Sequence, residues 1–503
     1  MIFFCVLIFL ILASLKLFYF VIWVPLRIQN FFKKQGVNGP SYRPWYGNTR
    51  EMIRMTNEVL SKSMPFNHDI VHRVLPDYYQ WSAKYGRTFL CWFGVRPRLV
   101  LVDPDMIKEV LFRTMDIIDR DSFNPLTKAL IGDGLPGLMG HKWAAHRKIA
   151  NPAFNMEKVK AWVPEMVTSI SKMLDNWEEK IRHCDTFEID VHTEFYNLAA
   201  EISSRTAFGS IFGKGKRIFE LQQQQKLPSY QAMQNVYIPG SRFLPTNANK
   251  LRWKLEKETR DSMRMIIETY KKTSDNSKNF LSILLSGSNR NKLGGGLDTE
   301  EVINEGKTLF FGWEATANTL TWAILLLAQH QEWQNKAREE VFRVCKDNEQ
   351  PCVENFQELK IVNMIIKETL RLYAPDNIIT RQTLRNVKIG SLNIPAGTEL
   401  YMPQTVVHHD TKIWGSDANE FNPARFVEPP KHLGAYFPFG IGSRICIGRN
   451  LAMVEAIIIL AMIIKQFSFE ISPSYVHAPM MLIMVQPQYG APVLVRRITN
   501  CQS

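Results

Sequence analysis

The length, composition and charge of the chain set the first limits on its function. Its 503 residues are 46% hydrophobic and 22% charged, a globular composition that excludes an intrinsically disordered protein. The formal net charge of +13 favours acidic lipid or an acidic partner protein. No basic run is long enough for a nucleic-acid-binding arm, so we expect no nucleic-acid partner. The seven cysteines are scattered and include no CxxC pair, which argues against a disulfide framework or a four-ligand zinc site.

Residues 1–24 form an apolar run with a single charge, Lys16. The run is long enough to cross a bilayer as one helix, and no small-residue cleavage site follows it. We therefore predict a permanent single-pass anchor; the alternative is a buried amphipathic helix. Positive residues after the run predict that the rest of the chain is cytosolic. These residues are Arg27, Lys33, Lys34 and Arg43.

Residues 25–45 are basic and, from Gly36 to Trp45, rich in Gly and Pro, which predicts a hinge between the anchor and the following domain. We find no clear linker in residues 46–503, so we predict one large domain there. The polar stretch Ser286–Gly296 is typical of a surface loop between two helices.

The remaining pattern predicts a mainly α fold with small β-sheets. Apolar residues recur at steps of three and four in Met156–Trp177, Lys250–Tyr270, Asp298–His330, Glu332–Val344 and Leu359–Tyr373. Asp298 and Glu301 form a predicted capping box at the start of the longest helix. Strand-like alternation is confined to Leu99–Val102, Val387–Ile389 and Val493–Arg496.

One cysteine lies in a setting that predicts chemistry. Residues 437–448 read FPFGIGSRICIG, and a strongly helical stretch follows Cys446. A thiol at a helix N-terminus is favoured to ionise and bind metal, and Arg444 lies two residues away, where it can neutralise an anionic cofactor group. The glycines allow an irregular backbone close to a flat ligand. The alternative is a buried cysteine in a Gly-rich turn.

This segment resembles the haem-binding signature of the cytochrome P-450 family, and the resemblance extends over essentially the whole chain. The matching residues are Phe439, Gly440, Gly442, Arg444, Cys446 and Gly448. The resemblance implies haem b held between the long central helix and the cysteine loop, with Cys446 as the iron ligand and Phe439 beside the haem. Several stretches, among them HDIVHRVLP and FGSIFGKGK, are most similar to plant microsomal members of clan seventy-two.

Other motifs occur in the family's order. Glu368 and Arg371 resemble its Glu-x-x-Arg pair, and Arg425 resembles the third member of that buried ionic cluster. The family usually has Glu at position 424, where this chain has Ala. The resemblance implies that the cluster is structural and holds the cysteine loop, since buried charges persist only when paired. The alternative for the first two residues is an ion pair on the surface.

Further arginines are implied to bind the haem propionates. Trp143 and Arg147 resemble the family's Trp-x-x-x-Arg element, and a four-residue step places both on one helix face. Arg381 and Arg444 resemble additional propionate partners, because guanidinium groups suit carboxylates. His146 is interpreted as a solvated neighbour.

The oxygen-handling helix departs from the family pattern of a small residue, Gly, any residue, an acid and Thr. The small residue is Phe311, and the hydroxyl that helps deliver protons is absent at Ala315. Glu314 is the acid, and Thr316 lies about 100° further round the helix, where a local bulge could re-aim it. These departures leave two interpretations open: an ordinary monooxygenase with tolerated changes, or an atypical oxidative rearrangement. The cysteine loop has no insertion, which argues against rearrangement.

The resemblance implies a monooxygenase that inserts one oxygen atom into an apolar small molecule of the terpenoid, steroid or hormone kind. Its catalytic proton relay would consist of Glu314 with Thr316 or water. Two rivals from other classes are a non-catalytic haem carrier and a membrane-tethered binding module without haem. The expected pocket linings are Phe310, Phe311, Trp313, Ile378 and Ile379.

Electrons must come from another protein, because the chain lacks a Gly-rich dinucleotide fingerprint and has no room for a flavin domain. The resemblance implies a membrane-bound NADPH–cytochrome P-450 reductase and a location in the endoplasmic reticulum membrane. The positive net charge suits an acidic flavin domain. Candidate docking residues are Lys142, Lys148 and Arg449.

Overall fold

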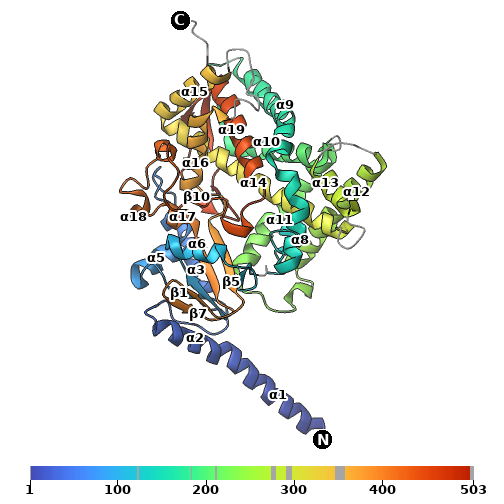
Figure 1. Cartoon of the computed structure of the whole chain (residues 1–503), viewed down its shortest axis with the longest axis vertical. Coiled ribbons are helices and arrows are strands. Elements are labelled where there is room, and N and C mark those ends of the chain that lie inside the picture. The colour runs from blue at the N-terminus through green and yellow to red at the C-terminus, as the bar shows by residue number, and fades with distance from the viewer. Residues whose placement is uncertain are drawn as a thin grey trace.

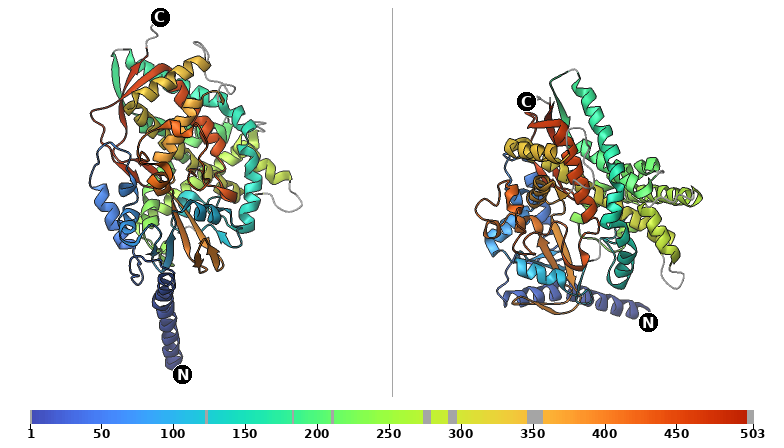
Figure 2. Two further views of the ribbon diagram at one scale, coloured as in Figure 1. Left: turned by 60° about the vertical axis from the view of Figure 1, so that its left-hand side comes forward. Right: turned by 45° about the horizontal axis from the view of Figure 1, so that its top comes forward.

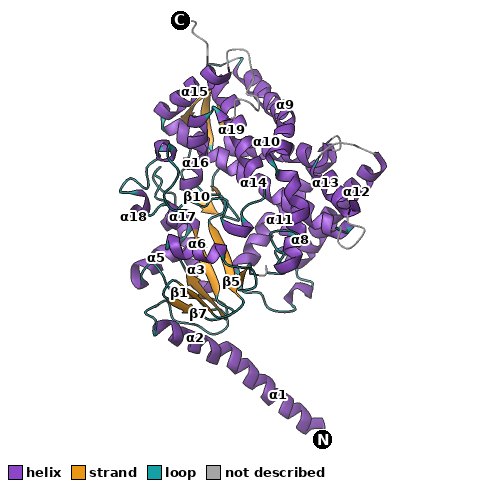
Figure 3. Cartoon of the chain, viewed as in Figure 1, coloured by secondary structure: helices purple, strands orange, loops and turns teal. Residues whose placement is uncertain are grey.

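The computed structural model describes residues 2–121, 124–182, 184–209, 212–273, 279–290, 297–345 and 357–498. Helices make up most of it and small sheets lie toward one side, which confirms the predicted fold class (Figures 1 and 3). The longer helices are α3 (Thr49–Leu60), α5 (Pro76–Tyr85), α6 (Pro104–Phe112), α8 (Gly140–Ala150), α9 (Met156–Ile181), α10 (Val191–Phe208), α11 (Phe212–Gln234), α12 (Asn247–Thr273), α13 (Phe280–Arg290), α14 (Thr299–Gln329), α15 (Gln331–Cys345), α16 (Lys360–Leu372) and α19 (Arg449–Gln466).

Four small sheets complete the domain. The largest has the strand order β1-β2-β8-β5-β3, formed by Leu90–Phe93, Arg96–Val100, Glu399–Pro403, Ile378–Thr383 and Ile118–Asp119. A second has the order β4-β12-β9, formed by Thr186–Asp190, Pro492–Arg497 and Phe467–Ile471. Two hairpins are β6–β7 (Val387–Ile389, Leu392–Ile394) and β10–β11 (Pro479–Met481, Val485–Pro487).

Helix α14 runs through the centre of the domain and packs against α10, α16 and α19 (Figure 1). The predicted capping box is present: Asp298 accepts a hydrogen bond from the backbone N–H of Glu301, whose side chain accepts one from Asp298 N–H. From Leu320 to Leu327 the apolar side chains have no exposed surface. A helix that is apolar on every side in this way belongs to the core, and it gives the domain a rigid axis.

The loop after the short helix α7 (Lys128–Ile131) is held against α14 by close backbone approach. A Cβ atom on Gly134 would lie 2.8 Å from the carbonyl oxygen of Asn304 and would clash with Thr308 Oγ1. Only glycine fits that contact. The contact therefore fixes Leu130 and Ile131 beside the central helix.

The N-terminal segment forms a continuous helical arm. Helix α1 (Ile2–Phe18), a π-helical turn (Tyr19–Trp23) and α2 (Val24–Lys33) follow one another, and the arm is long and apolar enough to cross a membrane. Its first part projects away from the domain in every view (Figure 2). Part of the segment predicted as a hinge is helical instead. Residues 25–33 belong to α2, and the buried Phe32 packs this helix against the domain.

The predicted helices and strands are present with boundaries shifted by a few residues at most. A loop was predicted at Ser286–Gly296, and this prediction is wrong for residues 286–290. The helical backbone of α13 includes them and ends at Arg290. Residues 291–296 lie outside the described part of the chain.

The predicted ionic cluster lies beneath the cysteine loop. Glu368 and Arg371 have no exposed surface and meet through two contacts of 2.7 Å, while Arg425 Nε lies 3.6 Å from Glu368. Arg371 also donates to the carbonyl of His408, whose ring accepts from the backbone N–H of Phe437 at 3.2 Å. A chain of hydrogen bonds therefore joins the cluster to the start of the cysteine loop, as expected.

Candidate active site

The cysteine loop is closed by its own backbone. The N–H of Cys446 donates to the carbonyl of Phe439 at 2.8 Å, and Gly440 and Gly442 have φ values of +68° and +76°. A Cβ on Gly442 would clash with the carbonyl of Leu111 in α6, so the loop packs on α6 through bare backbone. Helix α19 begins three residues after the cysteine, as the sequence predicts.

The Cys446 side chain lies on the wall of an interior space. It is exposed, yet burial among protein atoms raises the pKa of its thiol, and the N–H groups of Gly448 and Arg449 and the charge of Arg147 oppose that rise. The Asp376 side chain is likewise exposed, although burial among protein atoms raises the pKa of its carboxyl group. Gly312 of α14 is exposed although its neighbours Trp313 and Glu314 are buried. The central helix and the cysteine loop thus both open onto space inside the domain.

Arginines converge near the cysteine loop. Arg381 is buried on β5, and Arg444 forms an ion pair of 2.6 Å with Asp119. Burial and mutual repulsion lower the pKa of Arg381 to about 9 and that of Arg120 to about 10. Arg147 donates to the carbonyl of Ile445 at 2.8 Å, and burial lowers its pKa also. The guanidinium groups of Arg120, Arg381 and Arg444 therefore lie close enough together to repel one another.

Trp143 lies between two of these cations. The guanidinium of Arg444 lies 4.4 Å from the centre of its ring and that of Arg147 lies 6.0 Å from it. The predicted pairing of Trp143 and Arg147 on one face of α8 is thus present. His146, interpreted from sequence as a solvated neighbour, is buried instead, because its Nδ1 binds Glu305 of α14 at 2.7 Å.

These residues fit an anionic, planar, metal-carrying cofactor. Arg120, Arg381 and Arg444 all lie close enough to Asp119 for its charge to oppose the lowering of their pKa, and three guanidinium groups gathered in this way suit the two propionates of haem. Arg444 Nε is buried without a hydrogen-bond partner. Among the described residues no three His, Cys, Asp or Glu side chains gather as metal ligands, so Cys446 would be a single protein ligand. Haem b would supply the other iron ligands and the propionates.

A small apolar cluster lines the side of α14 at Ala315. It brings together α7, α11, α14 and the turn between β10 and β11. Its members, called the apolar cluster below, are Leu130, Ile131, Tyr230, Ala315, Ile483 and Met484. These side chains from four separate elements pack together and give this side of α14 an apolar surrounding.

The expected pocket linings are only partly placed there. Trp313 lies about 200° round the helix from Ala315 and packs against Tyr196 and Phe219 of α10 and α11. It lines a pocket there together with Tyr196 and Glu314, so its expected place in a pocket wall is present. Ile379 lies on the same face of β5 as Arg381, close to Gly440, whereas Ile378 points to the opposite face. The side chains of Phe310 and Phe311 lie outside the described residues.

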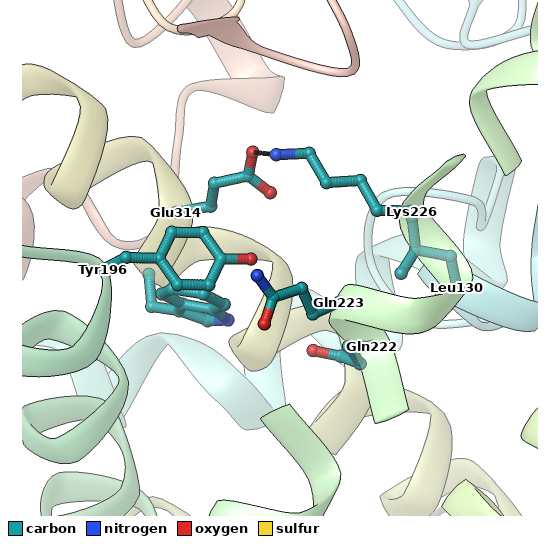
Figure 4. Close-up of a pocket in the computed structure, with 7 residues that line it drawn as sticks. Leu130, Tyr196, Gln222, Gln223, Lys226 and Glu314 are labelled. Carbon is teal, nitrogen blue, oxygen red and sulfur yellow. Dashed lines mark ion pairs between the residues drawn. The ribbon is translucent and has the colours of Figure 1, made fainter. Parts of the chain in front are cut away.

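The predicted acid Glu314 does not stand alone. Its carboxylate forms an ion pair with Lys226 of α11, and both side chains line a pocket with Tyr196 and Gln223 (Figure 4). Thr316, two residues after Glu314 on α14, is also buried. Neither Lys226 nor Arg120 was identified from the sequence. Each meets its partners only after distant segments fold together, and no local spacing signals that.

Comparison with known proteins defines the class that this fold and site represent. The family model described as "Cytochrome P450" matches residues 64–492, so the chain belongs to the cytochrome P450 family and is a haem-thiolate monooxygenase. It is 42% identical to cytochrome P450 734A1 of Arabidopsis thaliana over 95% of this chain and 93% of that protein. It is also 40% identical to cytochrome P450 CYP72A219 of Panax ginseng over 98% of each chain, and 37% identical to cytochrome P450 709B1 of Arabidopsis thaliana over 97% of each. These relatives confirm the predicted similarity to clan seventy-two of plants.

Proposed function

We propose that this monooxygenase oxidises an apolar small molecule of the terpenoid, steroid or hormone kind. The observation that carries the proposal is the space that the Cys446 side chain and Gly312 of α14 both border, next to the apolar cluster at Ala315. Haem, held through its thiolate ligand, would supply the activation of molecular oxygen. Apolar side chains on this side of α14 would orient a C–H bond of the substrate and exclude water from it.

The chain's own residues have separate tasks in this scheme. Cys446 donates electron density through its sulfur, and the N–H groups of Gly448 and Arg449 steady the charge on that sulfur. Trp143, Arg147, Arg381 and Arg444 would bind and orient the propionates, and Phe439 closes the loop beside them. Glu314 with Thr316 or water would carry protons inward along α14.

Ala315 favours a second candidate, an atypical oxidative rearrangement. Its methyl group packs against the apolar cluster, and its carbonyl accepts the Thr319 hydroxyl at 2.8 Å. Residue 315 therefore brings no hydroxyl to that face of the helix. A rearrangement that makes little use of protons and external electrons would tolerate this composition.

Electrons would reach the site from a membrane-bound NADPH–cytochrome P-450 reductase, with the anchor in the membrane of the endoplasmic reticulum. The N-terminal apolar arm and the excess of positive charge support this arrangement. Lys148 and Arg449 are exposed on α8 and at the start of α19. Lys142 is a weaker docking candidate, because Glu301 binds its ammonium group at 2.9 Å.

Counting electrons against product tests the proposed function. Lipophilic metabolites are first screened on the haem-loaded chain for spectral changes on binding. Each ligand found is then incubated with reductase, NADPH and isotopically labelled oxygen. A monooxygenase forms product carrying one labelled oxygen atom per NADPH consumed. Conversion that consumes no NADPH establishes the rearrangement instead, and absence of any conversion contradicts both.

A further inference from the structure

A chain of buried polar groups connects α8 with α14 outside the site described so far. Nδ1 of His146 lies 2.7 Å from Oε1 of Glu305, and the two residues are 3% and 1% exposed. The other ring nitrogen, Nε2, lies 3.5 Å from Oε1 of Glu301, whose side chain is 25% exposed. Lys142 binds the same carboxylate from the surface. A carboxylate, an imidazole and a second carboxylate therefore lead, in that order, from solvent into the core.

The inner end of this chain lies on the side of α14 that faces the interior space. One stripe along the helix contains, at steps of four, three and four residues, Glu301, Glu305, Thr308 and Gly312. A Cβ atom on Gly134 would lie 3.1 Å from Oε2 of Glu305 and would clash with Thr308 Oγ1, so these two oxygens adjoin the same glycine. Gly312, one turn beyond Thr308, is exposed to the interior space. The stripe thus leads from the buried chain to the site.

Glu314, the acid expected from the sequence, lies on another side of the same helix. At 100° per residue it lies about 200° round α14 from Gly312. Its side chain extends toward Lys226 of α11 (Figure 4). Thr316, by contrast, lies one turn after Gly312 and continues the stripe. The stripe therefore reaches Thr316 without passing Glu314.

The groups of the buried chain are of the kinds that pass protons. Imidazole can take up a proton at one ring nitrogen while the other nitrogen releases one, and carboxyl groups exchange protons with it. An ion pair that only held α8 against α14 would need one carboxylate, whereas His146 has a carboxylate near each nitrogen. The reaction of a monooxygenase consumes protons together with electrons, so it needs a route for protons into the domain.

We propose that Glu301, His146 and Glu305 form a proton inlet, which carries protons from solvent along the contact between α8 and α14 to the Gly312 side of the central helix. The proposal rests on the monooxygenase function proposed above and deepens it, because it names the residues that supply the protons. None of the three is assigned a contact with substrate or haem, and the hydroxyl groups further along the stripe lie between them and the site.

Each passage moves one proton and leaves the residues of the inlet unchanged. Glu301 takes a proton from solvent and gives it to Nε2 of His146, while Nδ1 releases its own proton to Glu305. Glu305 passes that proton to water or to the hydroxyl of Thr308, and so along the stripe to the oxygen that is being reduced. Rotation of the imidazole ring restores the first tautomer. No electron moves through the inlet, because NADPH supplies the electrons through the reductase.

Variants separate proton transfer from the structural role of the same residues. His146→Gln keeps a donor for the Glu305 carboxylate, so α8 stays held against α14, but an amide does not pass a proton on. Glu305→Gln keeps the shape of the buried side chain and removes the acid. His141→Gln makes the same change at an exposed position of α8 and is the matched control.

Proton arrival is measured on the full haem-loaded chain without any substrate. The reduced, oxygenated protein is frozen, given one further electron by irradiation and warmed in steps, and electron paramagnetic resonance records when the haem signal changes through arrival of a proton. We expect His146→Gln and Glu305→Gln to slow this step by roughly tenfold or more at a fixed temperature, and to enlarge its slowing in deuterated solvent. Haem content and the carbon monoxide spectrum should stay normal, and His141→Gln should match the wild type.

A competing route on the Glu314 side makes the test two-sided. Nε2 of His192 on α10 donates to Oδ1 of Asn318, one turn after Glu314, at 3.2 Å. His192→Gln should leave the proton step unchanged. If it slows the step while His146→Gln does not, protons enter past Glu314 and the inlet is overturned.

The remaining outcomes also decide the proposal. A proton step that is unchanged in both His146→Gln and Glu305→Gln overturns the inlet, and the monooxygenase function then stands. If one of these two variants loses its haem, the other decides alone. Failure of the proposed function shows itself differently, as a wild-type protein with a normal proton step that oxidises no ligand.

Discussion

Cys446 has a thiol whose pKa is raised by burial, although backbone N–H groups and Arg147 oppose the rise. Its ionisation therefore depends on a coordinated metal, which deprotonates a thiol outright. We expect Cys446→Ser to lose the red-shifted absorption of the reduced, carbon-monoxide-bound protein, because that band requires thiolate ligation. Circular dichroism serves as the folding control. A variant that keeps the shifted band would show that another residue is the ligand.

Thr316 lies two residues beyond Glu314 on α14, and its role in proton delivery is tested by removing the hydroxyl. Thr316→Val keeps the shape of the buried side chain. We expect it to lower product formed per NADPH by roughly tenfold or more, the usual scale for losing a general acid–base partner. Ala315→Thr is the complementary variant, and should raise that ratio by placing a hydroxyl at position 315. An unchanged ratio in Thr316→Val would assign the relay to water.

At the scale of single residues, the sequence predicted the site residues whose role follows from local spacing. Cys446, Glu368 and Arg371 lie within compact motifs, and the structure places them as expected. Lys226 was missed because Glu314 and Gln486 lie on a separate helix and strand. Arg120 was missed because Asp376 and Arg444 lie more than 250 residues further along the chain. The chain positions alone carry no trace of such contacts.

Buried histidines, which join different secondary-structure elements, predict how the stability of the fold depends on pH. His68 binds the Tyr373 hydroxyl at 2.8 Å, and that ring stacks on Trp322 of α14. Burial, with smaller contributions from neighbouring positive groups, lowers the pKa of His68 to about 3. Burial likewise lowers the pKa of His409 and of His477 to about 4.

These histidines make the fold sensitive to acid. The unfolded chain binds their protons near pH 6.5, whereas the folded chain resists them until about pH 3 to 4. The contribution of these histidines to the free energy of unfolding is therefore fully present above about pH 6.5. It decreases as the pH falls, by about 1.4 kcal/mol per pH unit for each histidine. His68→Gln should make the fall shallower, as measured by the thermal midpoint between pH 4.5 and 7.5. His432→Gln, at an exposed site, is the control and should leave the slope unchanged.

The helices were predicted well where one face is apolar and a cap marks the start. Helix α14 begins at its predicted capping box, and α16 covers the predicted span with an apolar face toward the core. The loop at 286–290 was predicted wrongly because Ser and Gly favour turns, whereas the helical backbone of α13 continues through them. The docking of α2 depends on Phe32 reaching the core, which composition does not reveal.

At the scale of the whole molecule, positive charge near the cysteine loop bears on electron supply. Lys148 and Arg449 are exposed. Burial lowers the pKa of Lys367 on α16, and the nearby positive charge of Arg449 lowers it further. Positive charge from α16 and α19 therefore meets at Lys367 and Arg449, and Lys148 of α8 directly follows Arg147, which contacts the cysteine loop. Screening weakens attraction between exposed charges as salt rises, with a Debye length of about 10 Å at 0.1 M.

We expect Lys148→Glu with Arg449→Glu to raise the reductase concentration needed for half-maximal turnover and to flatten the dependence of turnover on salt, because steering depends on opposite charges. The haem spectrum should remain normal. Lys271→Glu with Lys272→Glu makes the same change in net charge on α12 and should leave the reductase requirement unaltered. Equal effects of the two double variants would mean that net charge alone governs the encounter. If neither the requirement nor the salt response changes in Lys148→Glu/Arg449→Glu, the reductase binds to another face.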